Sequence, residues 1–190
     1  MKKIISIIAL GLVVISNAQV IIGDNIGTVP NGQKSSVLLE FAVGQQKGII
    51  LPYVRTLPAG IEVCTGTFVL DASNPSKAKV KYYNGIINAT NPDGWFDLSS
   101  DNEADVTSAL LHQPLAVNEN SNSKVVIGAA NSTNPGALVL ESDTKAMVLP
   151  MIESTDQIID PAPGMLVYIN KTGAKRLAVY NGKAWTYWKP

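Results

Sequence analysis

The sequence predicts a mainly β fold, built as two tandem copies of a small antiparallel β module with a short linker between them. Short runs of β-branched, aromatic and aliphatic residues alternate with Gly, Pro, Asn and Asp, a pattern typical of strands and turns. A series of sequence matches recurs in the same order in the two halves of the chain. Each half also carries a Tyr-Asn-Gly turn signal followed by a tryptophan, which favours a hairpin.

Residues 1–18 are predicted to be a secretory signal peptide. Two lysines follow Met1, the segment 4–15 is almost wholly apolar, and small residues precede Gln19. A membrane anchor is the alternative, but about a dozen apolar residues fall short of the ~20 that span a bilayer. We therefore expect cleavage before Gln19 and a mature chain that is secreted or held at the cell surface, without membrane insertion.

The two copies are predicted at residues 19–98 and 125–190, with residues 99–124 as the linker. The matching segments, first copy before second, are Ile22-Gly23 and Ile127-Gly128, Val37–Glu40 and Leu138–Glu141, Lys47–Pro52 and Lys145–Pro150, Phe68-Val69 and Leu166-Val167, Tyr83–Gly85 and Tyr180–Gly182, and Trp95 and Trp185. Coincidence can produce one or two such matches, but it is a poor account of a whole series in one order.

Strands are expected at Val37–Phe41, Ile49–Leu51, Thr67–Leu70, Val80–Tyr83, Leu138–Leu140, Met147–Leu149, Met165–Ile169 and Leu177–Tyr180. Pro52 and Pro150 directly follow two of these runs and should end them, because proline has no N–H for the ladder. Asn84-Gly85 and Asn181-Gly182 favour two-residue type I′ hairpins, since both residue types accept a positive φ.

The linker differs in character from the two copies. Ser99–Glu103 supplies residues that could cap a short helix over Ala104–His112, which Pro114 would stop. A flexible tether is the alternative, because Asn118–Ser123 is a wholly polar run.

Composition argues against an enzyme and against nucleic acid as a partner. Fifteen basic residues balance fifteen acidic ones, so the chain has no overall positive field. The single Cys excludes a disulfide within the chain and a thiolate-rich zinc site, and the single His excludes most histidine-based chemistry. The aspartates between positions 71 and 101 match no calcium loop. We therefore expect no metal and no cofactor.

Four polar residues are candidates for chemistry. Cys64 is interpreted as a small buried thiol, and His112 as a surface or packing residue. Glu40 and Glu141 occupy equivalent positions in the two copies, whereas a catalytic carboxylate pair would need both side chains in one site. We expect instead the same structural role performed twice, by an ion pair or a turn hydrogen bond.

One pattern in the second half resembles a known module. It consists of Ala137–Glu141, Lys145–Pro150, Pro163–Tyr168, Val179–Gly182 and Trp185. This pattern resembles a recurrent β module of exported Bacteroidota proteins and of phage tail-fibre-like proteins, over most of 137–188 and more loosely over 37–98. That module often has arginine after the proline, where this chain has Tyr53 and Met151, and Ala146 replaces its usual glycine. The resemblance implies an extracellular β module of surface or fibre proteins, with no catalytic activity.

The first function that these observations favour is that of a structural or interaction protein, which assembles with itself or docks on another surface protein. Val20, Ile21 and Ile22 form an apolar, β-branched run at the expected new N-terminus. This run could add a strand to the sheet edge of a neighbouring copy, or it could pair within its own copy.

The second function is that of a glycan-binding module that uses exposed aromatic side chains. Trp188, Tyr187 and Tyr53 are the candidate contacts, because aromatic faces bind apolar surfaces well. Trp95 and Trp185 are repeated in the two copies, which favours a core role for both. On a strand, Tyr187 would share a face with Trp185, and Trp188 would point to the opposite face.

Overall fold

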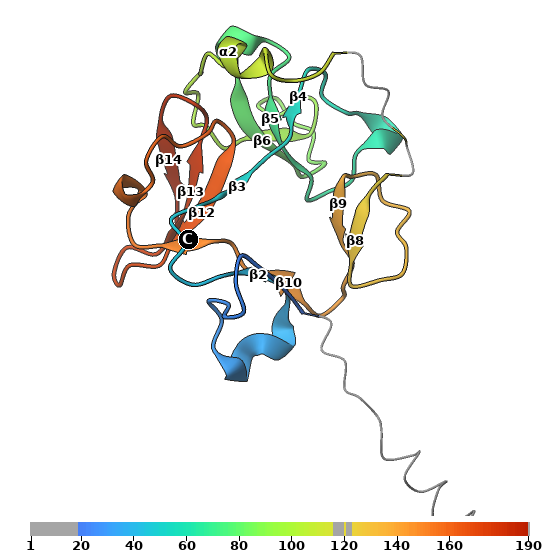
Figure 1. Ribbon diagram of the computed structural model, residues 1–190. Coiled ribbons are helices and arrows are strands. Elements are labelled where there is room, and N and C mark those ends of the chain that lie inside the picture. The colour runs from blue at the N-terminus through green and yellow to red at the C-terminus, as the bar shows by residue number, and fades with distance from the viewer. Residues whose placement is uncertain (1–18, 116–119, 121–122, 190) are drawn as a thin grey trace, which may run out of the picture.

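The computed structural model describes residues 19–115, 120 and 123–189 (Figure 1). The predicted signal peptide, the tail of the linker at 116–119 and 121–122, and Pro190 lie outside the described residues. Within the described part, no helix has the length and apolar character needed to cross a membrane.

The fold is mainly β, as the sequence predicts. Its strands are β1 (Val20–Ile22), β2 (Val37–Phe41), β3 (Ile49–Ile50), β4 (Tyr53–Val54), β5 (Phe68–Asp71), β6 (Lys79–Tyr83), β7 (Trp95–Asp97), β8 (Val125–Ile127), β9 (Leu138–Leu140), β10 (Ala146–Met147), β11 (Met151–Ile152), β12 (Met165–Ile169), β13 (Arg176–Tyr180) and β14 (Trp185–Trp188). The helical segments are η1 (Asn31–Ser36), η2 (Gly60–Glu62), η3 (Pro75–Lys77), α2 (Thr107–Leu110) and η4 (Thr155–Gln157).

The strands form mixed sheets rather than the purely antiparallel ones that the sequence suggested. The sheet orders are β1-β2-β10, β4-β5-β6-β7, β8-β9 and β11-β12-β13-β14, with β3 also beside β12. The parallel pairs are β1–β2, β2–β10, β4–β5, β8–β9 and β11–β12. The physical reason lies in the connections: residues 23–36 and 55–67 are long enough to return the chain to the same end of the sheet, as parallel pairing requires.

The β4–β7 and β11–β14 sheets share strand order and strand sense. Equivalent register pairs are Tyr53–Leu70 and Met151–Tyr168 between the first two strands, and Tyr83–Trp95 and Tyr180–Trp185 between the last two. Sheets β1–β2 and β8–β9 are likewise both parallel. The division into copies at 19–98 and 125–190 stays a prediction. Residues that occupy the same register position in corresponding sheets are called equivalent.

Two short strands cross between the halves of the chain. β3, from the first half, pairs antiparallel with β12, and β10, from the second half, pairs parallel with β2 (Figure 1). Pro52 and Pro150 follow these strands, in line with the prediction that they end them. The sequence did not reveal that the chain resumes at once as β4 and β11, each in a different sheet from the strand before it.

The largest core lies between the β4–β7 and β11–β14 sheets. Its buried members are Leu70, Ala72, Ala78, Val80, Leu98, Ala104, Val106, Leu110, Leu166 and Val179. Three of these, Ala104, Val106 and Leu110, come from the linker, so this part of the linker packs into the core. The helix α2 is shorter than predicted, because Ala104 is held extended in a β-bridge with Ala78 and the helix begins only after it.

The outer face of each four-stranded sheet carries a smaller apolar cluster. Trp95 is buried with Val63 and Val69 on one sheet, which confirms its predicted core role. Trp185 is half-buried and packs against the cluster of the other sheet, which contains Val167.

The Asn84-Gly85 and Asn181-Gly182 turns differ from the predicted type I′ geometry. Only the glycines have a positive φ, +70° and +111°, whereas type I′ requires it at both central residues. In each turn the asparagine side-chain oxygen instead accepts the backbone N–H two residues on, at 2.9 Å in both cases. This side-chain turn satisfies the backbone without the left-handed conformation, which explains why the prediction was wrong.

Candidate functional site

Two of the three aromatic candidates for glycan contact are packed against the main core. The Tyr53 hydroxyl donates to the carbonyl oxygen of Pro163 at 2.7 Å, and burial raises the pKa of that hydroxyl. Trp188 is half-buried; its Nε1 donates to the carbonyl oxygen of Leu98 at 2.9 Å, and its ring meets Phe96 edge-on at 5.6 Å. Both rings therefore help to hold the two four-stranded sheets together.

Tyr187 lies apart from the other two. It is exposed, and because neighbouring strand residues point to opposite faces, its ring lies on the other side of β14 from Trp188. The guanidinium carbon of Arg176 stands 5.6 Å from its ring centroid, and its hydroxyl lies 3.0 Å from the Oγ1 of Thr155. The structure thus brings Tyr53 and Trp188 to one core and leaves Tyr187 as a separate surface side chain.

Glu40 is a wholly buried carboxylate on β2 that holds the loop between β1 and β2. The backbone N–H of Val29 donates to its Oε2 at 2.8 Å, and the Lys34 Nζ lies 3.1 Å from its Oε1. The side-chain amide of Gln19 donates to the same Oε1. The loop 23–36 is therefore fixed to the strand that follows it.

Glu141, just after β9, does the same for the loop between β8 and β9. Its Oε1 accepts hydrogen bonds from the Ser132 hydroxyl and from the Asn134 Nδ2, the latter at 3.0 Å. Both Glu40 and Glu141 thus have the structural role predicted for them, and they lie in separate loops rather than in one site.

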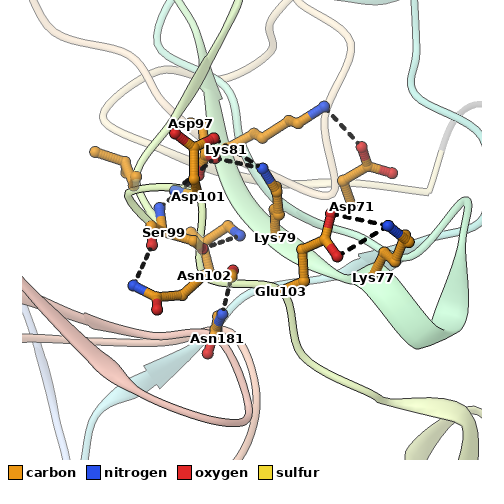
Figure 2. A network of polar contacts seen from close by, with 12 residues as sticks. Asp71, Lys77, Lys79, Lys81, Asp97, Ser99, Asp101, Asn102, Glu103 and Asn181 are labelled. Atoms are coloured by element: carbon orange, nitrogen blue, oxygen red, sulfur yellow. Dashed lines mark hydrogen bonds and ion pairs between the residues drawn. The ribbon is translucent and has the colours of Figure 1, made fainter.

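A network of ion pairs joins β5 and β6 to the loop that follows β7 (Figure 2). Lys81 pairs with Asp71 at 2.8 Å, and Lys79 pairs with Asp97 at 3.0 Å and with Asp101 at 3.1 Å. Burial would lower the pKa of Lys79, but the two aspartates raise it above the ordinary lysine value. Each cation here is paired with a carboxylate of the same chain, so the network stabilises the fold.

The same loop connects the two four-stranded sheets (Figure 2). The side-chain amide of Asn181, itself buried, donates to the carbonyl oxygen of Asn102 at 2.6 Å. Ser99 is also buried, and its hydroxyl accepts the N–H of Val80 at 2.8 Å. The loop is therefore hydrogen-bonded both to β6 and to the β13–β14 turn.

We expect the Asp71–Lys81 pair to make stability depend on acid pH. Burial would raise the pKa of Asp71, but hydrogen bonds from Lys81 and Ser73 lower it below its ordinary value of 3.8. A lowered folded-state pKa gives stability that is present above pH 3.8 and is lost as pH falls through the folded value. In urea unfolding of the chain 19–190, Asp71→Asn should cost about 1–3 kcal/mol at pH 7 and progressively less below pH 3.8. A cost that does not change with pH would contradict this assignment.

Cys64 and His112 are the remaining polar candidates. Cys64 is half-buried rather than buried as predicted, with its Sγ 3.7 Å from the Thr67 Oγ1, and His112 is exposed, in line with a surface residue. Over residues 19–115, 120 and 123–189, no three His, Cys, Asp or Glu side chains are grouped so that they could hold a metal ion.

The Val20–Ile22 run forms β1 and pairs parallel with β2 of the same chain. β1 is the outer strand of its sheet, and Ile22 is about half exposed. Addition of this run to a neighbouring copy stays a prediction.

The sheet β8–β9 exposes apolar side chains at a sheet edge that sequence reasoning did not single out. Leu138 is 50% exposed and Val125 57%, whereas Leu39 on the related strand β2 is 0% exposed. A two-stranded sheet is marginal in water, and an unpaired apolar edge is a template for another strand. Sequence alone gives no signal for this difference, because both strands are equally apolar.

Comparison with protein families gives one match. Residues 126–190 are similar to a phage tail like trimerisation region. The matched part holds β9 to β14 and most of β8. Comparisons with curated proteins and with solved structures gave no match. The match supports the resemblance to phage tail-fibre-like proteins, whereas the resemblance to exported Bacteroidota proteins stays a prediction.

Proposed function

We propose that this protein is a non-enzymatic structural protein that self-associates in a fibre-like or cell-surface assembly. The observation that carries the proposal is the similarity of residues 126–190 to a phage tail like trimerisation region. The described fold is in keeping with that role, because β8 and β9 expose apolar side chains that a second chain could cover.

The polar groups are in keeping with it as well. The buried carboxylate of Glu40 is used to hold a loop, and the Lys79 and Lys81 ammonium groups are paired within the chain. These buried and charged groups thus stabilise the fold. Docking on another surface protein is a further part of the proposal.

The proposed location is extracytoplasmic, either secreted or at the cell surface. Its support is the basic start, short apolar segment and small residues of the predicted signal peptide, together with the fibre-related family match.

The proposal predicts that the chain 19–190 is an oligomer in solution. Light scattering coupled to gel filtration should give a mass that is a whole multiple of the chain mass, with three copies as the multiple that the matched region suggests. The mass should hold over a tenfold dilution series if the interface is large and apolar. A chain that remains monomeric at high concentration would contradict self-association. The same measurement on a chain without Val20–Ile22 tests whether this run joins neighbouring copies.

Glycan binding is the second candidate, and the exposed ring of Tyr187 is the observation that favours it. The exposed Tyr187 ring can stack on a sugar ring, and the guanidinium of Arg176, which lies over the Tyr187 ring, can donate hydrogen bonds to the sugar hydroxyls. Saturable binding to a glycan array that is lost in Tyr187→Ala and kept in Tyr187→Phe would support this candidate. Binding that Tyr187→Ala leaves intact would exclude Tyr187 as the contact.

A further inference from the structure

Two contacts between the halves of the chain are made by backbone pairing. β10 lies on β2, where the N–H of Val148 donates to the carbonyl oxygen of Leu39 at 2.8 Å. β3 lies on β12, where the N–H of Leu51 donates to the carbonyl oxygen of Gly164 at 3.1 Å. In each case a short strand after a polar loop fills the edge of a sheet that belongs to the other half.

The edge of β2 that binds β10 has an equivalent on β9, where no described strand pairs with it. The N–H of Val125 donates to Ala137 and the N–H of Glu141 donates to Ile127, so alternate residues of β9 turn their backbone towards β8. Leu138 and Leu140 therefore turn their N–H and C=O groups away from β8. Within the described part of the chain, no strand pairs with that side of β9.

The edge of β12 that binds β3 has an equivalent on the first half of β5, where no described strand pairs with it. The N–H of Leu70 donates to the carbonyl oxygen of Pro52 at 2.9 Å, so Phe68, two residues earlier, points its N–H to the same side. β4 is too short to reach Phe68, and no other described strand lies there. On β12 the equivalent residue is Leu166, and there β3 fills the place.

Burial follows the pairing at both places. Leu39, which is in register with Met147 of β10, is wholly buried, whereas Leu138 on β9 is half-exposed. Gly164 and Leu166 are buried beside β3, whereas Gly66 is exposed and Phe68 only half-buried. The two empty edges are therefore the exposed counterparts of two edges that the chain itself covers.

The crossing strands each have one free side, and these sides fit the empty edges. In β3, the backbone groups of Ile49 and Leu51 face β12, so those of Ile50 face the other way. Val148 of β10, the residue equivalent to Ile50, uses that side to bind β2. In β10, the N–H of Val148 faces β2 and the register with β2 shifts between Ala146 and Met147. No described strand pairs with the side of β10 that lies away from β2, which corresponds to the side that β3 uses to bind β12. Each strand can therefore bridge two sheets.

We propose that a second copy of this chain docks by strand addition, with its β3 on the free edge of β9 and its β5 against the free side of β10. This inference rests on the proposed self-association and specifies the interface. Between two chains, this contact has the same two strand pairings that join the two halves within one chain. It is a head-to-tail interface, so it builds a ring if the rotation between copies closes and a filament if it does not.

Leu138→Pro tests the β9 edge, because it removes an outward N–H that has no partner in the single chain. Proline is tolerated on an edge strand where its missing N–H faces solvent, so circular dichroism and thermal unfolding should stay unchanged. Light scattering should show the wild-type chain 19–190 as an oligomer and Leu138→Pro as a smaller species. Leu138→Ala keeps the N–H and is the matched control, which should retain the wild-type mass.

The outcomes separate the two proposals. A monomeric wild type would overturn self-association itself. An oligomeric wild type whose mass is unchanged in Leu138→Pro would overturn strand addition at β9 and leave self-association standing.

A disulfide test gives a second readout that does not depend on proline. Met147 is in register with Leu39, and Leu39 pairs with Val20 as Leu138 pairs with Val125. By this register, which differs by two residues from the sequence match of Val37–Glu40 with Leu138–Glu141, the corresponding pair between two chains is Ile49 and Leu138. In a Cys64→Ser background, mixing Ile49→Cys chains with differently tagged Leu138→Cys chains should give a mixed disulfide under mild oxidation. Val139→Cys, whose side chain lies on the opposite face, is the control and should give little. Equal yields from both mixtures, or none from either, would overturn the inference.

Discussion

Trp95→Ala should lower the free energy of unfolding by about 3–5 kcal/mol. The Trp95 ring is only 4% exposed, packs with Val63 and Val69, and lies 5.3 Å from the ring of Tyr83. Its Nε1 also donates to the carbonyl oxygen of Pro58 at 3.3 Å, so truncation leaves both a cavity and an unpaired acceptor. Urea unfolding of the chain 19–190, followed by circular dichroism, measures the effect.

Two matched variants make the Trp95 result specific. Trp95→Phe keeps most of the packing and should cost less than the alanine variant. Trp185→Ala removes the equivalent ring of the second half, which is half-buried, and should also cost less. A loss below 1 kcal/mol in Trp95→Ala would show that the ring is not part of the core, since buried tryptophan truncations cost far more.

Glu40→Ala should cost about 3 kcal/mol, because it removes a buried acceptor from several donors at once. The N–H of Val29 loses its partner in a buried setting, and Lys34 loses its ion pair. Urea unfolding measures the loss. The loop 23–36 should also become more open to limited proteolysis, because its main attachment to β2 is gone.

The controls for Glu40 use the second half of the chain. Glu40→Gln keeps an acceptor for the N–H of Val29 and should recover part of the stability. Glu141→Ala removes two side-chain hydrogen bonds from a half-buried position and should cost less than Glu40→Ala. Equal costs for Glu40→Ala and Glu141→Ala would show that burial does not set the size of the effect.

Most strands could be predicted from the sequence, because their signal is local. Val37–Phe41, Leu138–Leu140 and Met165–Ile169 have the predicted bounds, since each is an apolar run between turn residues. β4 and β11 were missed, because each is two residues long, follows a proline and exists only through pairing with β5 or β12. A run of two residues has no periodicity from which to predict a strand.

The candidate surfaces were harder to predict from the sequence than the strands. The shared role of Glu40 and Glu141 could be predicted because it depends on equivalent positions. The exposure of β9 could not, since Leu138–Leu140 is as apolar as the buried start of β2. β10 pairs with β2, whereas no described strand pairs with the equivalent side of β9, and no local pattern predicts which strand a two-residue segment will join.

The crossing of β3 and β10 has a consequence for how the chain folds. β2 pairs with β10, and β3 with β12, so the β1–β2–β10 sheet and the β3 pairing cannot form until the second half has been synthesised. Pairings between residues so far apart in the chain make folding slow, because the loop must close before the contacts stabilise it. The same crossing ties the halves together at two places, so a protease that cuts the linker would leave two fragments that remain associated.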